Sequence, residues 1–487
     1  MNFKQELILS ISSQSSIIYI MTDEEERLEN AIQIISKQIF STSMCTWDFI
    51  NGYTGNPNTS KKALRNPLEA LEIIEQYNLQ TPKIFLLKDY NIFLNDSTIV
   101  RKIKNIITCI KTTHSYIIIC SSSIKIPNTL TEYIKIINFP LPNQKEIENE
   151  IKQVFNLINK NEHRYIKYLS NKYQGFSLRQ IRASLSEIIL SNLSIQDSLK
   201  KIDNEKRNII QQTDILDFYP STNSLKKVGG LYNLKNWLKK RKYSFSSKAQ
   251  NYGLPNPKGI LLVGIQGTGK SLSAKAISQE WNLPLLKLDI GKIFASLVGE
   301  SETRIRKAIN FSEKCAPCIL WIDEIDKGFT KSTFSNDSGT TNRVLGALLT
   351  WLSEKNTNVF VVATTNTLVN LPTEIIRKGR FDEIFFLDLP KYQERTDIFK
   401  IHLKKFRPLT WFNYNIEYLS KITEQFSGAE IEQAIIEAMY NSFYENREFT
   451  TKDIVNAIKH TIPIAFIDKE DINKLQEWAY SGKVRLA

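Results

Sequence analysis

Cysteine and histidine are scarce in this sequence, and both shortages exclude kinds of protein. Five cysteines are scattered over 487 residues, too few for a disulfide framework, which points to a reducing compartment. The four histidines lie far apart and form no H-E-x-x-H pattern, so a zinc-protease domain is excluded. The stretch Cys315–Cys318 reads C-x-x-C but has no second pair beside it, and we interpret its cysteines as packing residues.

Long apolar runs are also missing. No stretch approaches the roughly 20 apolar residues that a membrane helix needs, so we expect no transmembrane segment. The opening stretch "MNFKQELILSISSQS" contains an acidic residue and lacks the pattern of a cleavable signal. Length and composition are those of an ordinary soluble protein of two or three domains.

The balance of charge is basic, with a formal net charge of +13. A basic surface attracts nucleic acid when its charges are gathered on one face. Here the basic residues are spread along the chain, which is rich in Lys, Asn and Ile in the manner of an AT-rich genome. We therefore do not expect nucleic acid to be a partner.

One stretch carries a phosphate-binding pattern. The letters "GIQGTGKS" (264–271) read G-x-x-x-x-G-K-S, and they lie between the apolar run "GILLV" and a helical pattern. Such a loop turns its N–H groups toward a polyphosphate, with Lys270 near the β- and γ-phosphates and the Ser271 hydroxyl on Mg²⁺. The pattern predicts an ATP site made of Gly264, Ile265, Gln266, Gly267, Thr268, Gly269, Lys270, Ser271 and Leu272.

Two adjacent carboxylates end a second apolar stretch, "CILWIDEID" (318–326). Such a pair is costly at the end of a buried strand unless an ion or ligand balances its charge. We predict that Asp323 holds Mg²⁺ through water, together with Ser271, and that Glu324 polarises the attacking water.

Three further residues are candidates for the chemistry at the γ-phosphate. Asn366 ends the apolar stretch "VFVVATTN", where its amide could orient water. Arg377 and Arg380 follow in "IIRKGRFDE". In an isolated subunit they would be ordinary surface residues, whereas in a ring they could reach a neighbour's γ-phosphate as arginine fingers. We predict catalytic roles for all three.

Taken together, residues 225–487 resemble an AAA-type ATPase module. The segments that carry this resemblance follow the family's order: "VGGLYNLKNWL", "GLPNPKGILLVG", "VGESETRIRKAI", "ATTN", "RKGRFD" and "FSGAEIEQAIIEA". The resemblance implies a P-loop α/β fold with a parallel sheet and a small helical lid, hydrolysis of ATP with Mg²⁺, and homo-oligomeric rings, most often hexamers. It also implies that Gly229 lies on the adenine side and that Gly428 and Ala429 pack beside the nucleotide.

Two departures from the broad AAA pattern limit the resemblance to one group within the family. Ile265-Gln266 stands where Pro-Pro is usual, and Leu297 stands where unfolding motors carry an aromatic residue. With "LPLLKLDIG", "LVGESE" and "PCILWIDEIDK", they resemble the AAA-type ATPases encoded in algal plastid genomes and in cyanobacteria. That group implies the chloroplast stroma for a plastid-encoded protein, or the cytoplasm of a cyanobacterium.

The first half of the chain resembles a second copy without the chemistry. "TPKIFLLKDYNIFL" (81–94) lines up with "APCILWIDEIDKGF" (316–329), which sets Lys88 opposite Asp323 and Asp89 opposite Glu324. The loop that corresponds to the P-loop is acidic, "DEEE" (23–26), and would repel ATP. We expect a degenerate AAA-like α/β domain that binds no nucleotide; an unrelated α/β domain is the alternative.

These patterns predict the boundaries of the domains. They are a degenerate domain at 1–202, a linker at 203–227, a large ATPase subdomain at 228–389, and a helical lid with the C-terminal tail at 390–487. The leading hypothesis for function is a ring-forming ATPase that remodels or assembles a protein partner. A slow ATP-dependent switch is the second, slightly favoured by Leu297 because leucine grips a peptide less well than a flat ring; a nucleic-acid remodeller is the third.

Overall fold

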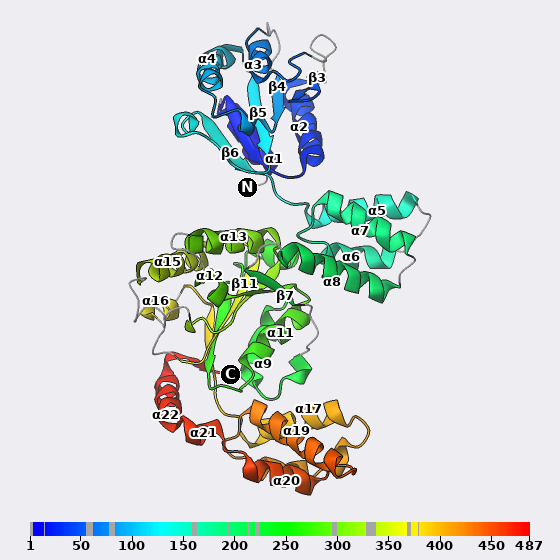
Figure 1. Cartoon of the computed structure of the whole chain (residues 1–487), viewed down its shortest axis with the longest axis vertical. Helices are drawn as coiled ribbons and strands as arrows, with labels where there is room; N and C mark the ends of the chain where they lie inside the picture. The colour runs from blue at the N-terminus through cyan, green and yellow to red at the C-terminus, as the bar shows by residue number, and fades with distance from the viewer. Residues whose placement is uncertain are drawn as a thin grey trace. The chain divides into compact units, whose positions relative to one another are not determined.

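The computed structural model describes residues 3–13, 15–54, 62–76, 83–113, 115–157, 163–191, 194–211, 215–219, 225–294, 300–327, 338–367, 372–377 and 379–487. The chain divides into two compact units, Met1–Asn192 and Leu193–Ala487. Each unit contains a mostly parallel sheet with helices on both of its faces (Figure 1). Each unit is described separately below.

The sheet of the first unit has six strands in the spatial order β3-β2-β4-β5-β1-β6. Its pairs are parallel except β2 with β3. Most of its central strands are continuous runs of isoleucine, leucine and phenylalanine, as expected for strands covered on both faces. The strands are β1 (Ile17–Met21), β2 (Cys45–Asp48), β3 (Gly52–Thr54), β4 (Ile84–Lys88), β5 (Tyr116–Ser121) and β6 (Ile134–Asn138).

Helices cover this sheet, and a short bundle follows it. Successive residues of β1 point to opposite faces: Ile18 and Ile20 join a core with α1 and α2, whereas Ile17 and Tyr19 join a core with α3 and α4. The helices are α1 (Phe3–Ser12), α2 (Glu25–Phe40), α3 (Pro67–Gln76), α4 (Ser97–Thr113), α5 (Gln144–Leu157), α6 (His163–Lys172) and α7 (Leu178–Leu190).

The sheet of the second unit has seven strands in the order β13-β12-β8-β11-β10-β9-β7. Only the edge pair of β7 with β9 is antiparallel. The strands are β7 (Leu216–Tyr219), β8 (Gly259–Gly264), β9 (Leu285–Leu288), β10 (Cys318–Ile322), β11 (Val359–Thr365), β12 (Glu383–Leu387) and β13 (Arg485–Leu486).

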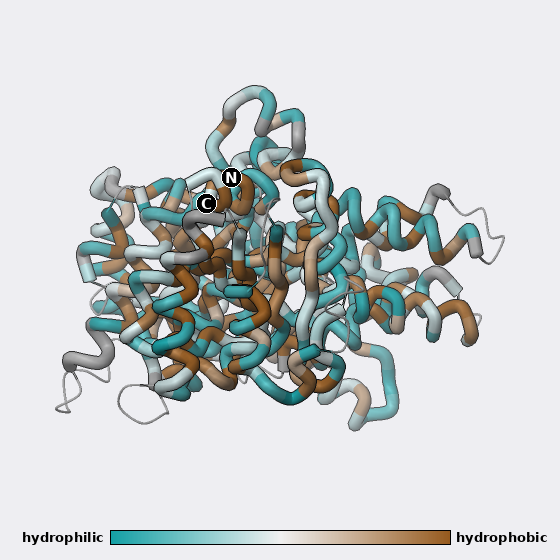
Figure 2. Tube along the Cα trace, turned by 90° about the horizontal axis from the view of Figure 1, so that it is seen from above, coloured by the Kyte–Doolittle hydropathy of each residue, from teal (hydrophilic) through white to brown (hydrophobic). Residues whose placement is uncertain are grey.

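The helices of this unit fall into two groups, those around the sheet and those of the lid. Around the sheet lie α8 (Ile195–Gln211), α9 (Tyr232–Arg241), α10 (Ser247–Asn251), α11 (Lys270–Trp281), α12 (Ile290–Phe294), α13 (Glu300–Lys314), α15 (Ser338–Glu354) and α16 (Thr373–Ile376). The lid contains α17 (Tyr392–Phe406), α18 (Ile416–Ile422), α19 (Gly428–Tyr444) and α20 (Thr451–His460). The teal and brown stretches that alternate along the helices in Figure 2 reflect their amphipathic patterns.

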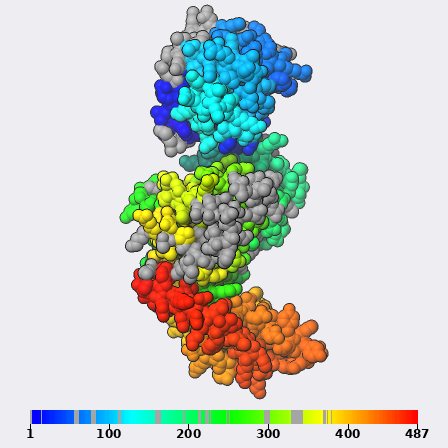
Figure 3. All heavy atoms as spheres, turned by 60° about the vertical axis from the view of Figure 1, so that its left-hand side comes forward, coloured from blue at the N-terminus to red at the C-terminus, as the bar shows by residue number. Residues whose placement is uncertain are grey.

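The lid has a core of its own, separate from the cores of the sheet. Phe399, Leu403, Leu419, Ile431 and Ile454 are all buried in it. In Figure 3 the lid residues, in orange, form one compact body of atoms. The lid can therefore be treated as a rigid group of helices, as its short loops and interlocking apolar faces require.

The two sheets share one topology. When the five corresponding parallel strands are numbered in chain order, both sheets place them in the spatial order 5-1-4-3-2. The strands are β1, β2, β4, β5 and β6 in the first unit and β8, β9, β10, β11 and β12 in the second. The internal correspondence noted in the sequence therefore extends to the order of the strands.

The segment 203–227 was predicted to be a linker, but parts of it are regular elements of the second unit. Residues 203–211 are part of α8, and β7 pairs with β9 at the edge of the second sheet. Leu216 and Phe218 of β7 are buried in the core of that sheet. The division of the chain lies at 192/193, because an amphipathic helix and an alternating strand have apolar faces that need a core.

The C-terminal tail also has a definite place. After α21 (Ile464–Ile467) and α22 (Lys469–Trp478), β13 pairs with β12. Ala479 is buried in the sheet core. The tail therefore packs on the large subdomain, although the sequence grouped it with the lid.

Candidate nucleotide site

The phosphate-binding loop joins a buried strand to a helix. β8 is buried along its whole length, and α11 begins at Lys270. Gly267 and Gly269 have φ angles of +80° and +92°, in the left-handed region that glycine tolerates best. These two glycines let the loop turn sharply between strand and helix, with the helix N-terminus at its end.

The loop lies close to the lid. A Cβ atom on Gly267 would be 2.6 Å from Ser427 Oγ, so only glycine allows this approach. Ser427 caps α19 in a capping box with Glu430. The Ala429 N–H then donates a 3.1 Å hydrogen bond to the Gly267 carbonyl. Gly428 and Ala429 therefore lie beside the loop, where the resemblance places them.

Lys270 is buried at the base of the loop. Its Nζ donates hydrogen bonds of 2.7 Å to the carbonyls of Gly264 and Ile265. Burial lowers the pKa of Lys270 to about 8, although Asp326, Asp323 and Glu324 oppose the shift. The ammonium group is therefore held beside the loop, where a polyphosphate would provide a stronger partner.

Asp323 and Ser271 meet at the carboxyl ends of β10 and β8. The Ser271 hydroxyl donates to Asp323 Oδ1 at 3.1 Å, and the Thr364 hydroxyl donates to the same oxygen at 2.7 Å. Thr364 lies on the neighbouring strand β11 and was not among the predicted residues. It also accepts a hydrogen bond from the Glu324 N–H at 3.0 Å, so one hydroxyl connects both members of the acid pair.

Glu324 has a strained backbone, with a φ of 49°. A left-handed conformation is unusual for glutamate and occurs most often where a site needs a particular side-chain direction. The Asn366 amide donates to Glu324 Oε1 at 3.5 Å, and Lys327 Nζ lies 2.5 Å from Oε2. The structure therefore brings Asn366 next to the predicted base.

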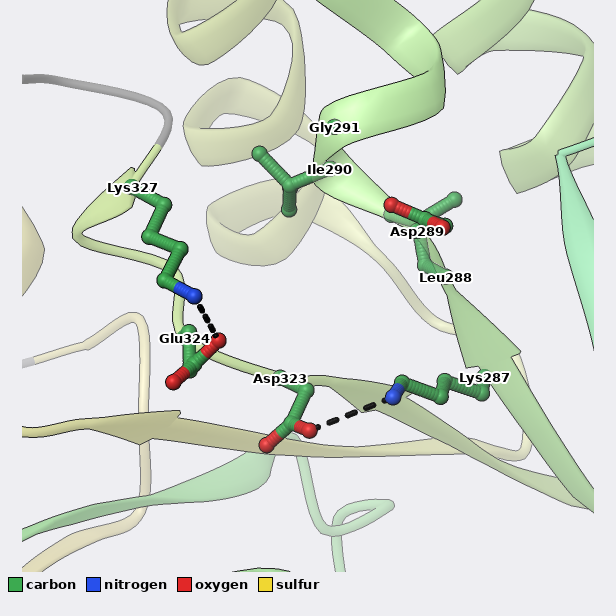
Figure 4. Close-up of a pocket in the computed structure, with 8 residues that line it drawn as sticks. All are labelled: Lys287, Leu288, Asp289, Ile290, Gly291, Asp323, Glu324 and Lys327. Atoms are coloured by element: carbon green, nitrogen blue, oxygen red, sulfur yellow. Dashed lines mark ion pairs between the residues drawn. The ribbon is translucent and has the colours of Figure 1, made fainter. Parts of the chain in front are cut away.

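A cavity of about 360 Å³ opens beside the acid pair. Asp323, Glu324, Lys287 and Lys327 all line it, and Figure 4 shows Asp323 facing Lys287 and Glu324 facing Lys327. Lys287, on β9, lies 3.2 Å from Asp323 Oδ2. Sequence reasoning missed this lysine, because nothing in its strand pattern shows that it faces an acidic residue on the next strand.

Ile265 takes the place of a proline for a structural reason. Its N–H donates to the Leu387 carbonyl of β12 at 3.2 Å, and proline has no N–H to donate. Its side chain is 3% exposed and packs with Ala465 and Ile472. Thr268 Oγ1 closes the loop by donating to the Ile265 carbonyl at 2.7 Å. Gln266, in contrast, is exposed.

Gly229 and Leu272 lie around the loop as supporting residues. A Cβ atom on Gly229 would be 2.4 Å from Ile398 Cγ1 of α17, so the entry segment approaches the lid closely. Leu272 is partly buried against the core beneath α11. Both positions border the site; a direct contact with ATP remains a prediction for each.

Arg377 and Arg380 lie at the other end of the strands. Arg377 is exposed, and Arg380 donates to the Glu374 carbonyl. Asp382 N–H binds the carbonyl of Gly259, the first residue of β8, whereas the loop follows the last residue of β8. The length of β8 separates the two ends by roughly 16 Å. Among the described residues, no hydrogen bond or ion pair joins either arginine to the loop or the acid pair.

At the corresponding place in the first unit two charges are reversed, those of Glu25 and Lys88. Three residues (22–24) link β1 to α2, whereas five residues (265–269) link β8 to α11. Glu25 begins α2 where Lys270 begins α11. Lys88 ends β4, and Asp89 has a φ of 50°, close to the 49° of Glu324. The alignment of Lys88 and Asp89 with the acid pair therefore agrees with backbone geometry.

Pairing within the protein balances these reversed charges. Lys88 forms a 2.8 Å ion pair with Glu29 of α2. Burial, together with the Asp89 carboxylate, raises the pKa of Glu25. Glu24 Oε1 accepts the Leu178 N–H at the start of α7 at 2.7 Å, and Arg27 binds its other oxygen at 2.6 Å. A carboxylate thus occupies the N-terminus of α7, a helix that begins with a serine capping box as α19 does.

Three family models match the chain. The model described as "ATPase family associated with various cellular activities (AAA)" matches residues 260–389, and "AAA+ lid domain" matches residues 413–456. The model "SpoVK-like AAA ATPase, N-terminal domain" matches residues 3–139. The predicted fold class, an AAA module after a second AAA-like α/β domain, is confirmed.

Relatives extend over the whole chain. The "uncharacterized AAA domain-containing protein ycf46" of Gracilaria tenuistipitata var. liui is 55% identical over 100% of both chains. The chain belongs to the ycf46 family of AAA proteins. A ycf46 protein of Guillardia theta is 49% identical over 100% of this chain and 97% of its own. The ycf46 relatives are proteins of algal plastid genomes, as the sequence motifs predicted.

A more distant relative shares the ATPase part alone. The proteasome-activating nucleotidase of Saccharolobus islandicus (strain Y.N.15.51 / Yellowstone #2) is 38% identical over 211 residues, which cover 42% of this chain and 53% of the relative. With the matched AAA domain and lid, this identifies the chain as an ATP hydrolase. No helix in the described part of the chain is long and apolar enough to cross a membrane. Leu297 lies outside the described residues.

Proposed function

We propose that this ATPase works as a ring of six identical subunits and uses ATP hydrolysis to remodel or assemble a protein partner. The position of Arg377 and Arg380 is the observation that carries this proposal. They lie roughly 16 Å from their own loop along β8, farther than a guanidinium group can reach. A neighbouring subunit would bring them to the γ-phosphate.

Mg²⁺ fits the residues at the end of β10. Ser271 Oγ and Asp323 Oδ1 lie 3.1 Å apart, and the described residues contain no cluster of three or more metal-ligating side chains. Mg²⁺ in nucleotide sites uses few protein oxygens and completes its shell with phosphates and water. Ser271 and Asp323 would hold the ion, which would neutralise charge on the phosphate oxygens.

Each remaining residue has a role that its surroundings support. Lys270 would exchange the carbonyls of Gly264 and Ile265 for phosphate oxygens. Glu324 would accept the proton of the attacking water, and Asn366 beside it would orient that water. The main-chain N–H groups of the loop, with Gly428 and Ala429 of the lid, would enclose the phosphates and the nucleoside.

The class of partner can be tested by stimulation of turnover. We expect the ATPase rate to rise with a protein substrate and to remain unchanged with DNA or RNA. A Glu324→Gln variant, which would hold ATP without turnover, is suited to capturing that partner from chloroplast stroma, the location that we propose. Stimulation by nucleic acid alone would contradict the proposal.

For the first unit we propose a binding or scaffolding role without nucleotide. Its shorter loop, the Lys88–Glu29 pair and the Glu24 carboxylate at the start of α7 support this proposal. The test uses the full chain with Lys270→Ala, so that the second unit no longer binds ATP tightly. Calorimetry with Mg·ATP should then show only the weakened binding of the second unit, with no component as tight as that of the wild type. Residual Mg²⁺-dependent binding that a further Lys88→Ala substitution alters would place a nucleotide in the first unit.

A further inference from the structure

Lys287 shares one face of the sheet with the acid pair. It pairs with Trp321 in the parallel register of β9 and β10, so the two side chains lie on the same face. Asp323 follows Trp321 by two residues and points the same way. The α11 residue Ser271 reaches Asp323 on this face as well. Lys287 is thus placed by the sheet itself beside the predicted metal ligand.

Two contacts hold the Lys287 ammonium group. It lies 3.2 Å from Asp323 Oδ2 and 4.6 Å from the centre of the Trp321 ring. The Lys287 and Asp323 side chains are only 26% and 19% exposed, so solvent screens the pair less than it would at an open surface. The contact over the ring adds a cation–π attraction that keeps the ammonium group in place.

The two oxygens of Asp323 have separate partners. Oδ1 accepts the hydroxyls of Ser271 and Thr364, and Oδ2 faces Lys287. The lysine therefore helps to fix the plane of the carboxylate, with Oδ1 toward the loop. Its positive charge also opposes the approach of a second cation to the same carboxylate.

We propose that Lys287 is a positioning residue of the metal site. Its ammonium group is a built-in counter-ion that orients Asp323 and sets how much Mg²⁺ is needed for the metal–ATP complex to form. This inference rests on the proposed role of Asp323 as a metal ligand. Removal of the charge should therefore lower the Mg²⁺ requirement, whereas loss of a residue that directly binds phosphate would weaken nucleotide binding at every Mg²⁺ concentration.

The experiment measures binding rather than turnover. A fluorescent, non-hydrolysable ATP analogue is titrated with Mg²⁺ in the wild type and in Lys287→Met, which keeps an unbranched side chain one atom shorter and removes the charge. The Mg²⁺ concentration at half-maximal binding should fall about two- to five-fold, the range expected for a partly exposed ion pair. Lys287→Arg keeps the charge and should behave as the wild type does.

Lys275→Met is the matched control. Lys275 lies over the same Trp321 ring at 5.5 Å and over Tyr219 at 5.2 Å, so its removal changes the ring contact without removing the partner of Asp323. An unchanged or higher Mg²⁺ midpoint in Lys287→Met, in a protein with wild-type circular dichroism, would overturn the inference. If binding by the wild type itself is independent of Mg²⁺, the proposed metal site fails and this inference fails with it.

Discussion

Lys270 is the residue on which phosphate binding depends most directly. Its Nζ is buried and already positioned by two carbonyls. Lys270→Ala removes a charge-assisted interaction worth about 1.5–3 kcal/mol, or roughly a ten- to hundred-fold loss of ATP affinity. Calorimetry should show this loss, while Lys275→Ala on the same helix should bind normally. ATP affinity equal to that of the wild type would show that the loop is not the phosphate site.

A second residue, Glu324, allows the hydrolysis of ATP to be distinguished from its binding. Glu324→Gln preserves the shape of the side chain but removes the base, so we expect unchanged ATP affinity and a large loss of turnover. Asn366 and Lys327 contact different oxygens of Glu324, so the single amide oxygen of the variant can keep one of these two donors. A phosphate-release assay beside a binding assay makes the distinction. Normal turnover would move the role of base to Asp326, a nearby carboxylate that is buried.

At the scale of elements, Ile265 connects the phosphate loop to the C-terminal helices. Its side chain packs with Ala465 of α21 and Ile472 of α22. Ile265→Ala would remove buried apolar volume, which commonly costs about 2–5 kcal/mol. Hydrogen exchange should therefore become faster in α21 and α22, whereas Gln266→Ala, at an exposed position, should leave exchange unchanged. Equal exchange in both variants would mean that Ile265 does not hold these helices.

Contacts between elements also connect the phosphate loop with the lid. α19 begins beside Gly267, and its first turn is fixed by the capping box of Ser427 and Glu430. Glu430 also accepts the Ile464 N–H of α21 at 2.6 Å. One glutamate therefore connects the start of the lid helix with the helices that support the loop, so a shift of the lid would reach the loop through short, direct contacts.

At the scale of the whole molecule, the ring makes a prediction about mixed subunits. If Arg380 acts on a neighbour's ATP, Arg380→Ala should bind ATP and hydrolyse it poorly, since arginine fingers contribute on the order of 10³–10⁵ in turnover. Mixed with Glu324→Gln, it should regain activity, because an intact Glu324 then faces an intact arginine. Turnover per subunit should also rise with protein concentration until assembly is complete.

Two controls make this result interpretable. Neither variant alone should regain activity at higher concentration, and a mixture of Lys270→Ala with Glu324→Gln should recover less, since its only ATP-binding subunits lack the base. Concentration-independent turnover together with no recovery on mixing would replace the ring with the slow monomeric switch that the sequence also allows.

The local sequence pattern was sufficient to predict much of the fold and of the candidate site. The P-loop and the acid pair carry their meaning in residue type and spacing, because a phosphate loop needs glycines, a lysine and a hydroxyl at set intervals. The stretch 81–94 could be matched to 316–329 from the sequence as well, since buried parallel strands are continuous apolar runs. The expected linker at 203–227 differed because its helix and strand find their apolar partners in another part of the chain.

The sequence by itself determined the family, the ATP chemistry and the succession of strands and helices along the chain, since these depend on residues that are near one another in the sequence. Only the tertiary structure decided which side chains on different strands or helices contact one another. It placed Lys287 opposite Asp323, packed Ile265 under α21 and α22, and set Glu24 at the start of α7. Such contacts join distant residues, and their energy arises only when folding removes those side chains from water and sets them at bonding distance.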